Sequence, residues 1–103
     1  MRTIKQSSDF NEATKSPGVV LIDCYADWCM PCKMQKPILE KFEGNHPEVQ
    51  VLALNIDENQ DLANSLSIKS IPTLIWIKNG EVVSTEVGLR KEAQLEVSLE
   101  KLK

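Results

Sequence analysis

Short apolar runs alternate with segments of mixed polarity along the 103-residue chain. Runs of consecutive apolar residues are typical of strands that are buried on both faces of a sheet. We expect three such strands, at 18–26, 49–56 and 73–77. A weaker strand is predicted at 3–5. The more polar, alternating segment 81–87 suits a strand at a sheet edge, and Asn79-Gly80 before it favours a two-residue hairpin turn.

Apolar residues spaced three or four positions apart predict helices between these strands. A first helix is expected at 9–15, where Ser8 and Asp9 provide a capping-type start. A short helix is expected to be capped by Asn59. A C-terminal helix is indicated by the spacing of its leucines, Leu95, Leu99 and Leu102.

The longest helix is predicted to run from the cysteines near position 30 to Gly44. Its buried face is expected to carry four apolar side chains: Met34, Ile38, Leu39 and Phe42. Pro37 lies inside this helix. Because a proline lacks an N–H group and crowds the carbonyl four residues earlier, we expect one kinked helix rather than two helices.

The resulting order βαβαβαββα predicts an α/β fold. The early strands need parallel crossovers and the late hairpin is antiparallel, so a mixed sheet covered by helices is expected. A chain of 103 residues is long enough for one domain and too short for two, so we expect a single domain over residues 1–103.

Charge and hydropathy exclude several classes of partner. Twelve Lys and Arg residues against fifteen Asp and Glu residues give a net charge of −3, so nucleic acid is not expected as a partner. No apolar run approaches the roughly 20 residues that cross a bilayer, so no membrane span is expected. No apolar stretch follows the basic residues at the N-terminus, so a secretory signal is not expected in this chain.

The three cysteines are the first residues that indicate chemistry. Two of them form Cys29-Met30-Pro31-Cys32, and Cys24 lies in an apolar run. An odd number of cysteines does not fit a disulfide framework. A Cys-x-x-Cys motif between a strand and a helix indicates either a redox pair or half of a metal site.

Within this motif the two sulfurs are expected to have different roles. The partial positive charge of a helix N-terminus lowers the pKa of a thiol, so Cys29 is expected to be the nucleophilic thiolate. Cys32, one turn further on, is expected to lie more deeply in the helix, where it is not attacked from outside, and to attack the mixed disulfide and release the substrate. Pro31 is tolerated in the first helical turn and stiffens the connection, and Met30 and Pro31 together tune the redox pair.

Asp23 is an unusual residue for the middle of an apolar strand, six positions before Cys29. Burial disfavours a charged carboxylate, so its pKa is expected to rise, as a proton donor and acceptor near neutrality requires. We therefore expect Asp23 to manage the proton of Cys32. The alternative is an aspartate that is hydrogen-bonded to loop amides.

Several segments that contain these residues occur in a recognisable order: Val20-Leu-Ile-Asp23, Ala26-Asp-Trp-Cys-Met-Pro-Cys-Lys33, Pro37, Leu54-Asn-Ile-Asp57, Ser70-Ile-Pro-Thr73, Lys78-Asn-Gly80 and Gly88. In this order and spacing they resemble the thioredoxin family across nearly the whole chain. The resemblance implies the thioredoxin fold, a central mixed sheet with helices on both faces. It also implies a cis bond at Ile71-Pro72, in a loop that faces the cysteines, with Trp28 and Gly88 completing a docking surface for substrates.

The function implied by this resemblance is thiol-disulfide exchange. Such a protein cycles Cys29 and Cys32 between dithiol and disulfide, needs no bound cofactor, and reduces disulfides of target proteins in the cytoplasm. The resemblance also implies that a thioredoxin reductase, an NADPH-dependent flavoprotein, supplies the electrons. We expect the protein to act as a monomer.

Three positions depart from the usual pattern of the family. Met30 replaces a glycine between the cysteines, so the redox potential need not match that of the common motif. Ala53 stands where a lysine usually accompanies the buried aspartate, which removes an influence that would lower the pKa of Asp23. Cys24 replaces an aromatic residue, and we expect it to be an inert core thiol that faces away from Asp23.

The sequence allows two alternative functions. A zinc site would need His46 with the three cysteines, but a helix of about 13 residues spans roughly 20 Å and separates His46 from Cys32. His46 is instead expected to be a solvated turn residue before Pro47. The second alternative is a protein-binding module that uses the surface around Trp28 and Pro72, with an incidental redox pair. Substitution of both cysteines by serine would distinguish this module from a reductase.

Overall fold

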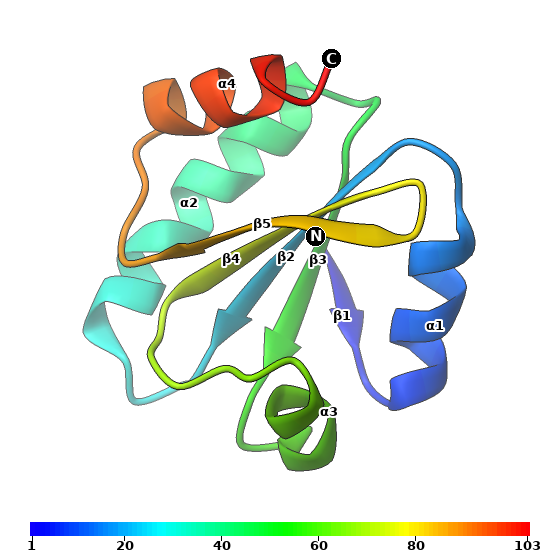
Figure 1. The fold of residues 1–103 in the computed structure, drawn as a ribbon. Coiled ribbons are helices and arrows are strands. Elements are labelled where there is room, and N and C mark those ends of the chain that lie inside the picture. Colours follow the sequence, from blue (N-terminus) through cyan, green and yellow to red (C-terminus); the bar gives the residue numbers. More distant parts are fainter.

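The computed structural model describes residues 1–103 as five strands and four helices in the predicted order. Figure 1 shows their arrangement. The elements are β1 (Arg2–Ile4), α1 (Ser7–Lys15), β2 (Val19–Tyr25), α2 (Met30–Asn45), β3 (Gln50–Asn55), α3 (Gln60–Ser65), β4 (Thr73–Lys78), β5 (Glu81–Val87) and α4 (Glu92–Glu100).

The strands form one mixed sheet in the order β1-β3-β2-β4-β5. β1, β3 and β2 are parallel, whereas β4 is antiparallel to β2 and β5 is antiparallel to β4. The most apolar strand, β2, therefore lies at the centre, and the polar strand β5 lies at an edge. In the turn between β4 and β5, Asn79 and Gly80 both have positive φ, as the hairpin prediction requires.

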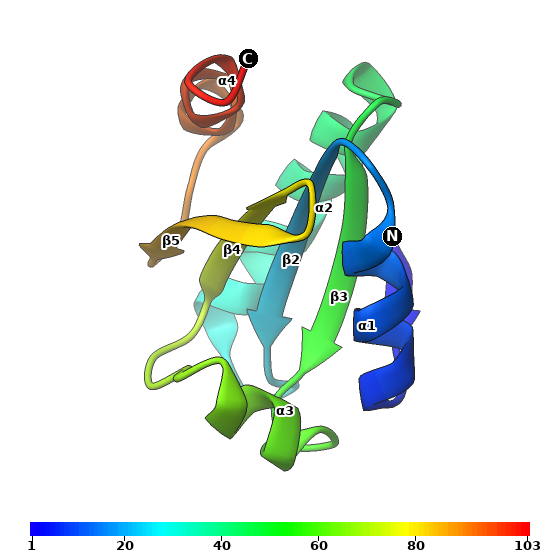
Figure 2. The same ribbon diagram turned by 45° about the vertical axis from the view of Figure 1, so that its right-hand side comes forward.

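Helices cover both faces of the sheet, which Figures 1 and 2 show from two directions. One core lies between the sheet and α1 with α3, and it includes Ala13 and Leu62. The other lies between the sheet and α2 with α4, and it includes Phe42 and Leu95. Because neighbouring residues of a strand point to opposite faces of the sheet, β2 contributes side chains to both cores. For the same reason, Asp23 and Cys24 lie on opposite faces.

The buried face of α2 differs from the predicted one. Its buried residues are Cys32, Gln35, Leu39 and Phe42, while Ile38 is only half-buried. Met34 is 58% exposed, so its assignment to the core was wrong. The helix is continuous through Pro37 and ends at Asn45, one residue beyond the predicted Gly44. The kink at Pro37 stays a prediction.

Two helix starts also differ in detail from the predictions. α1 begins at Ser7, two residues earlier than predicted, and the carboxylate of Asp9 accepts hydrogen bonds from the N–H groups of Lys5 and Gln6. Asn59 does precede α3, but its side chain does not cap the helix. Its amide donates instead to the backbone carbonyls of Ile4 and Asn55, and so ties β1 to the end of β3.

His46 is not the solvated turn residue that we predicted. It caps the C-terminal end of α2, and its side chain is only 17% exposed. Its ring lies 2.7 Å from a carboxylate oxygen of Glu96 on α4, 3.3 Å from one of Glu48, and against the ring of Phe42. The hydrogen bond to Glu96, reinforced by Glu48, raises the pKa of His46 above its usual value, although desolvation opposes this.

Replacing His46 is therefore expected to lower stability in a pH-dependent way. Because the folded pKa is raised, the stabilising charge is fully present below the unfolded pKa and is lost as pH rises through the folded pKa. We expect His46→Gln to lower the free energy of unfolding by about 0.5–1 kcal/mol more at pH 5.5 than at pH 8.5. Urea unfolding at both values measures this, and a pH-independent loss would contradict it. Glu96→Gln should show the same trend.

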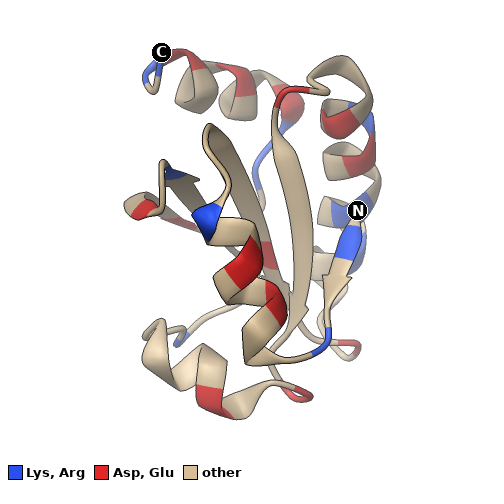
Figure 3. Cartoon of the chain, turned by 90° about the vertical axis from the view of Figure 1, so that its right-hand side faces the viewer, with Lys and Arg blue, Asp and Glu red and all other residues tan.

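Charged side chains are spread over the molecule. In the view of Figure 3, segments of ribbon with basic residues and segments with acidic residues are interspersed. None of the helices has both the length and the apolar character that crossing a membrane requires.

Candidate active site

Cys29 and Cys32 lie at the start of α2, immediately after the loop that follows the central strand β2, and they form a disulfide. Cys29 is the N-cap residue of α2, and its sulfur accepts a hydrogen bond of 3.2 Å from the N–H of Cys32. This N–H and the helix dipole both favour negative charge on the Cys29 sulfur. The thiolate at Cys29 stays a prediction, and the position of this sulfur at the helix N-terminus supports it.

The two sulfurs do not differ in burial. Cys29 is 5% exposed and Cys32 is 4% exposed, because the disulfide draws both cysteines into one small cluster with Ala26. The predicted difference in accessibility is therefore not visible in the disulfide form. What distinguishes the two cysteines is position, since Cys29 caps the helix and Cys32 lies within its first turn.

Asp23 lies on β2 and is 2% exposed. Its Oδ1 atom has no hydrogen-bond partner, so the alternative of a carboxylate held by loop amides does not apply to this oxygen. Burial raises the pKa of Asp23 to about 7. A carboxyl group with this pKa can both donate and accept a proton near neutrality.

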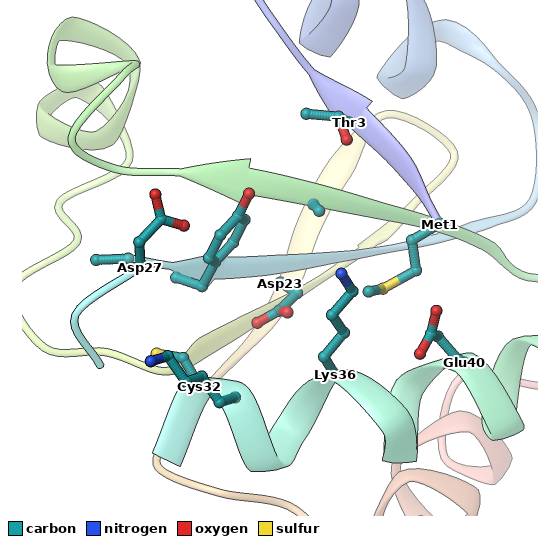
Figure 4. A pocket seen from close by; sticks show the side chains of 11 residues that line it. Met1, Thr3, Asp23, Asp27, Cys32, Lys36 and Glu40 are labelled. Atoms are coloured by element: carbon teal, nitrogen blue, oxygen red, sulfur yellow. The ribbon is translucent and has the colours of Figure 1, made fainter. Parts of the chain in front are cut away.

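A cavity of about 550 Å³ connects Asp23 with Cys32. Figure 4 shows the Asp23 carboxyl group between β2 and α2, with Cys32 and Lys36 on the α2 side. Ala53 of β3 is the register partner of Asp23 and also lines the cavity. Its methyl group cannot reach across this space, so the side chain next to Asp23 on β3 provides no counter-charge.

Of the predicted docking residues, Trp28 precedes Cys29 in the chain and Ile71 packs on the cysteine cluster. Trp28 is 68% exposed, and its indole N–H donates to Asp57 at 2.8 Å. The peptide bond between Ile71 and Pro72 is cis, as predicted. Gly88 has a φ of +96°, which favours glycine, and its N–H donates to the carbonyl of Pro72 at 2.8 Å.

Comparisons with known proteins agree with this geometry. The sequence model of the family described as Thioredoxin matches residues 2–101. The chain belongs to the thioredoxin family. It is 39% identical over 97 residues to the thioredoxin of Bacillus subtilis, and the match covers 93% of each protein.

Solved thioredoxin structures share the fold over nearly the whole chain. Thioredoxin from Fasciola hepatica superimposes with a TM-score of 0.93 at 27% identity and full coverage of both chains. A second similar structure comes from work on the structural basis of the thiol resolving mechanism in yeast mitochondrial 1-Cys peroxiredoxin via glutathione/thioredoxin systems. It superimposes with a TM-score of 0.90 at 27% identity. It covers 98% of this chain and 94% of the other.

As a member of the thioredoxin family, the protein is a thiol-disulfide oxidoreductase that cycles the Cys29–Cys32 pair between dithiol and disulfide. Thioredoxins have no prosthetic cofactor. The His, Cys, Asp and Glu side chains of this chain form no group of three or more that could hold a metal ion. His46 lies at the opposite end of α2 from the disulfide.

Cys24 stands where the usual pattern of the family has an aromatic residue. It is fully buried, and it belongs to the core on the α1 and α3 side of the sheet, whereas Asp23 faces α2. Burial, followed by the nearby charge of Asp23, raises the pKa of the Cys24 thiol to about 12. The predicted burial of Cys24 on the face away from Asp23 is confirmed, and its lack of reactivity stays a prediction.

Sequence analysis assigned no role to Asp57, which accepts the Trp28 hydrogen bond, or to Gln35. Gln35 is fully buried on α2, three residues after Cys32, and its side chain bonds to the backbone of Arg90. The available signal was its spacing, because 32, 35, 39 and 42 follow a helical repeat. A polar side chain within such a repeat indicates a partner in the interior.

Proposed function

We propose that this member of the thioredoxin family reduces disulfides of target proteins, with Cys29 as the attacking thiolate, Cys32 as the resolving thiol and Asp23 as the proton carrier. The observation that carries this assignment is the Cys29–Cys32 disulfide at the N-terminus of α2, next to a buried carboxyl group without a hydrogen-bond partner at Oδ1. Met30 and Pro31 lie between the sulfurs and tune the stability of the dithiol against the disulfide.

In the first step the Cys29 thiolate attacks one sulfur of the target disulfide. A bond forms between Cys29 and that sulfur, and the second target sulfur leaves as a thiolate that takes up a proton. In the next step the Cys32 thiolate attacks the Cys29 sulfur and displaces the remaining target thiolate. The target has then gained two electrons and two protons, and Cys29 and Cys32 are left as a disulfide.

Asp23 serves the second step. Cys32 must lose its proton before it can attack, and Asp23 lines the same cavity. With a pKa of about 7, Asp23 accepts that proton in its ionised form and returns it to solvent through the cavity. Because this pKa is near neutral, both the protonated and the ionised form of Asp23 are populated at constant neutral pH.

Target proteins are proposed to dock on the surface formed by Trp28, Ile71, Pro72 and Gly88. Support comes from the exposure of Trp28, the packing of Ile71 on the cysteine cluster and the contact of Gly88 with Pro72. Trp28 is exposed, Ile71 and Gly88 are half-buried and Pro72 is buried, so a target would contact mainly the first three. This surface suits extended segments of many proteins better than one specific shape.

The electrons for the next cycle are proposed to come from a thioredoxin reductase, an NADPH-dependent flavoprotein. The peroxiredoxin named with one structural neighbour indicates one class of target. A reducing compartment such as the cytoplasm suits the unpaired thiol of Cys24, and no bound cofactor is needed because the sulfurs carry the electrons. We also propose that the protein acts as a monomer of one domain.

Insulin reduction tests the proposed function directly. With dithiothreitol as the electron source, a catalytic amount of the protein is expected to accelerate precipitation of the insulin B chain at least about tenfold, because an activated thiolate exchanges faster than free dithiothreitol. Turbidity measures the reaction. The Cys29→Ser, Cys32→Ser double variant is the control for binding without exchange. Equal rates for the protein and this control would contradict a reductase and favour a binding module.

A further inference from the structure

Gln35 forms a two-point contact with one distant residue. Its Oε1 atom accepts a hydrogen bond of 2.7 Å from the Arg90 N–H, and its Nε2 atom donates one of 2.9 Å to the Arg90 carbonyl. The two residues are 55 positions apart in the chain. Because the Gln35 side chain is fully buried, water cannot replace either bond without opening the structure.

Arg90 has no other support for its backbone. It lies in the segment between β5 and α4, outside regular secondary structure, and no backbone-to-backbone hydrogen bond involves it. The side-chain amide of Gln35 therefore acts toward Arg90 as a neighbouring strand would, with one donor and one acceptor. A hydrophobic side chain at position 35 would make neither of these bonds to the half-buried Arg90.

The same segment forms part of the proposed docking surface. It begins at Gly88, whose N–H donates to the carbonyl of Pro72. Residues 88–90 are thus bonded at one end to the Pro72 loop and at the other end to α2, which carries Cys32 one turn before Gln35. Gln35 is the link that ties this wall of the docking surface to the helix with the reactive sulfurs.

We propose that Gln35 is a positioning residue for protein substrates: it holds residues 88–90 at a fixed place relative to the Cys29–Cys32 pair. This inference rests on the proposed function. A protein substrate that lies across Gly88 and the loop of the buried Pro72 needs residues 88–90 and that loop held in place while its disulfide reaches Cys29. A small disulfide needs access to Cys29 alone, so it does not depend on this contact.

The decisive variant is Gln35→Met, which keeps the length and helix propensity of the side chain but makes neither hydrogen bond. With insulin as substrate, kcat/KM is expected to fall about tenfold through a higher KM, because two hydrogen bonds that order the docking segment are lost. The rate with the small disulfide 5,5′-dithiobis(2-nitrobenzoate) is expected to stay within about twofold of wild type. Hydrogen exchange of the Arg90 amide is expected to accelerate at least about tenfold.

Leu39→Ala is the matched control for a general loss of stability. Leu39 is fully buried on the same helix, in the core formed with α4, and its truncation leaves both Gln35 bonds in place. This variant is expected to melt at a lower temperature yet keep the wild-type ratio of insulin to small-disulfide activity. If Leu39→Ala changes that ratio as Gln35→Met does, the positioning role is overturned.

Gln35→Glu provides a partial rescue that depends on protonation. A neutral carboxylic acid has one donor and one acceptor, as an amide has, whereas a carboxylate cannot donate to the Arg90 carbonyl. The quantity to compare is the ratio of the KM of Gln35→Glu for insulin to the KM of wild type at the same pH. This ratio is expected to be near one at pH 5 and to increase several-fold by pH 8. A flat ratio would contradict the two-point contact as the source of the effect.

Two further outcomes would overturn the positioning role: unchanged protection of the Arg90 amide in Gln35→Met, or equal losses with both substrates. Failure of the proposed function would look different, because wild-type protein would then fail to accelerate insulin reduction. If only the positioning role fails, wild-type protein still accelerates insulin reduction, and Gln35→Met affects insulin and the small disulfide equally.

Discussion

Cys29→Ser is expected to reduce multiple-turnover reduction of insulin at least about tenfold, to the rate with dithiothreitol alone. A serine hydroxyl at the N-cap of α2 is not ionised near neutrality, so the N–H of Cys32 and the helix dipole have no thiolate to stabilise. Cys32 remains, but it lies inside the first turn and lacks the capping position. Retained multiple turnover in Cys29→Ser would contradict the assigned order of attack.

Cys32→Ser is expected to fail at the following step. Cys29 still attacks the target disulfide, but without a resolving thiol the mixed disulfide persists. Non-reducing electrophoresis and mass spectrometry should show a covalent complex that dithiothreitol releases, formed in one equivalent per protein. Cys24→Ala is the matched control, because that thiol is buried on the opposite face of the sheet and its loss should leave turnover unchanged. Complex formation by Cys29→Ser instead would reverse the two roles.

The topology could be predicted from sequence because each strand has its own local signal. β2 and β4 are apolar on consecutive positions, and β5 alternates, which distinguishes the central strands from the edge strand. The redox pair was predictable for the same reason. Cys29 and Cys32 are close in sequence, and their position between a strand and a helix determines their chemistry.

What sequence analysis missed depends on partners far along the chain. The buried face of α2 was assigned from its apolar residues, so Met34 was placed inside and Gln35 was overlooked. Gln35 is buried because Arg90, 55 positions later, provides a donor and an acceptor. His46 is likewise held by Glu96, 50 positions later. Periodicity reports which residues are apolar, whereas a satisfied buried polar group requires knowledge of its tertiary partner.

Asp23→Asn is expected to stabilise the oxidised protein above neutral pH. Below about pH 3.8 the carboxyl group is protonated in both the folded and the unfolded state and costs nothing. Between 3.8 and about 7, folding must keep protonated a group that the unfolded chain ionises, so the stability of wild type falls as pH rises. Above about 7 the penalty is constant, at about 4 kcal/mol for this difference in pKa.

An asparagine cannot ionise, so it removes this penalty, although its amide is left with unsatisfied groups of its own. We therefore expect Asp23→Asn to raise the free energy of unfolding by about 2–4 kcal/mol at pH 8 and to leave it nearly unchanged near pH 4. Urea unfolding across this pH range measures the difference. Asp27→Asn is the matched control, since Asp27 is an exposed carboxylate that lines the same cavity. As a surface substitution, it should change the free energy of unfolding at pH 8 by less than about 0.5 kcal/mol.

The same substitution is expected to slow disulfide exchange, because Cys32 loses the group that accepts its proton across the cavity. Single-turnover reduction of insulin by pre-reduced Asp23→Asn should be about 10–100-fold slower at pH 7, and the gap should narrow at higher pH as hydroxide deprotonates Cys32 directly. Stability and rate then change in opposite directions in one variant, as expected for a residue kept for chemistry at a cost to folding. A variant that is less stable and equally fast would show that Asp23 is a structural residue and would remove the proton carrier from the mechanism.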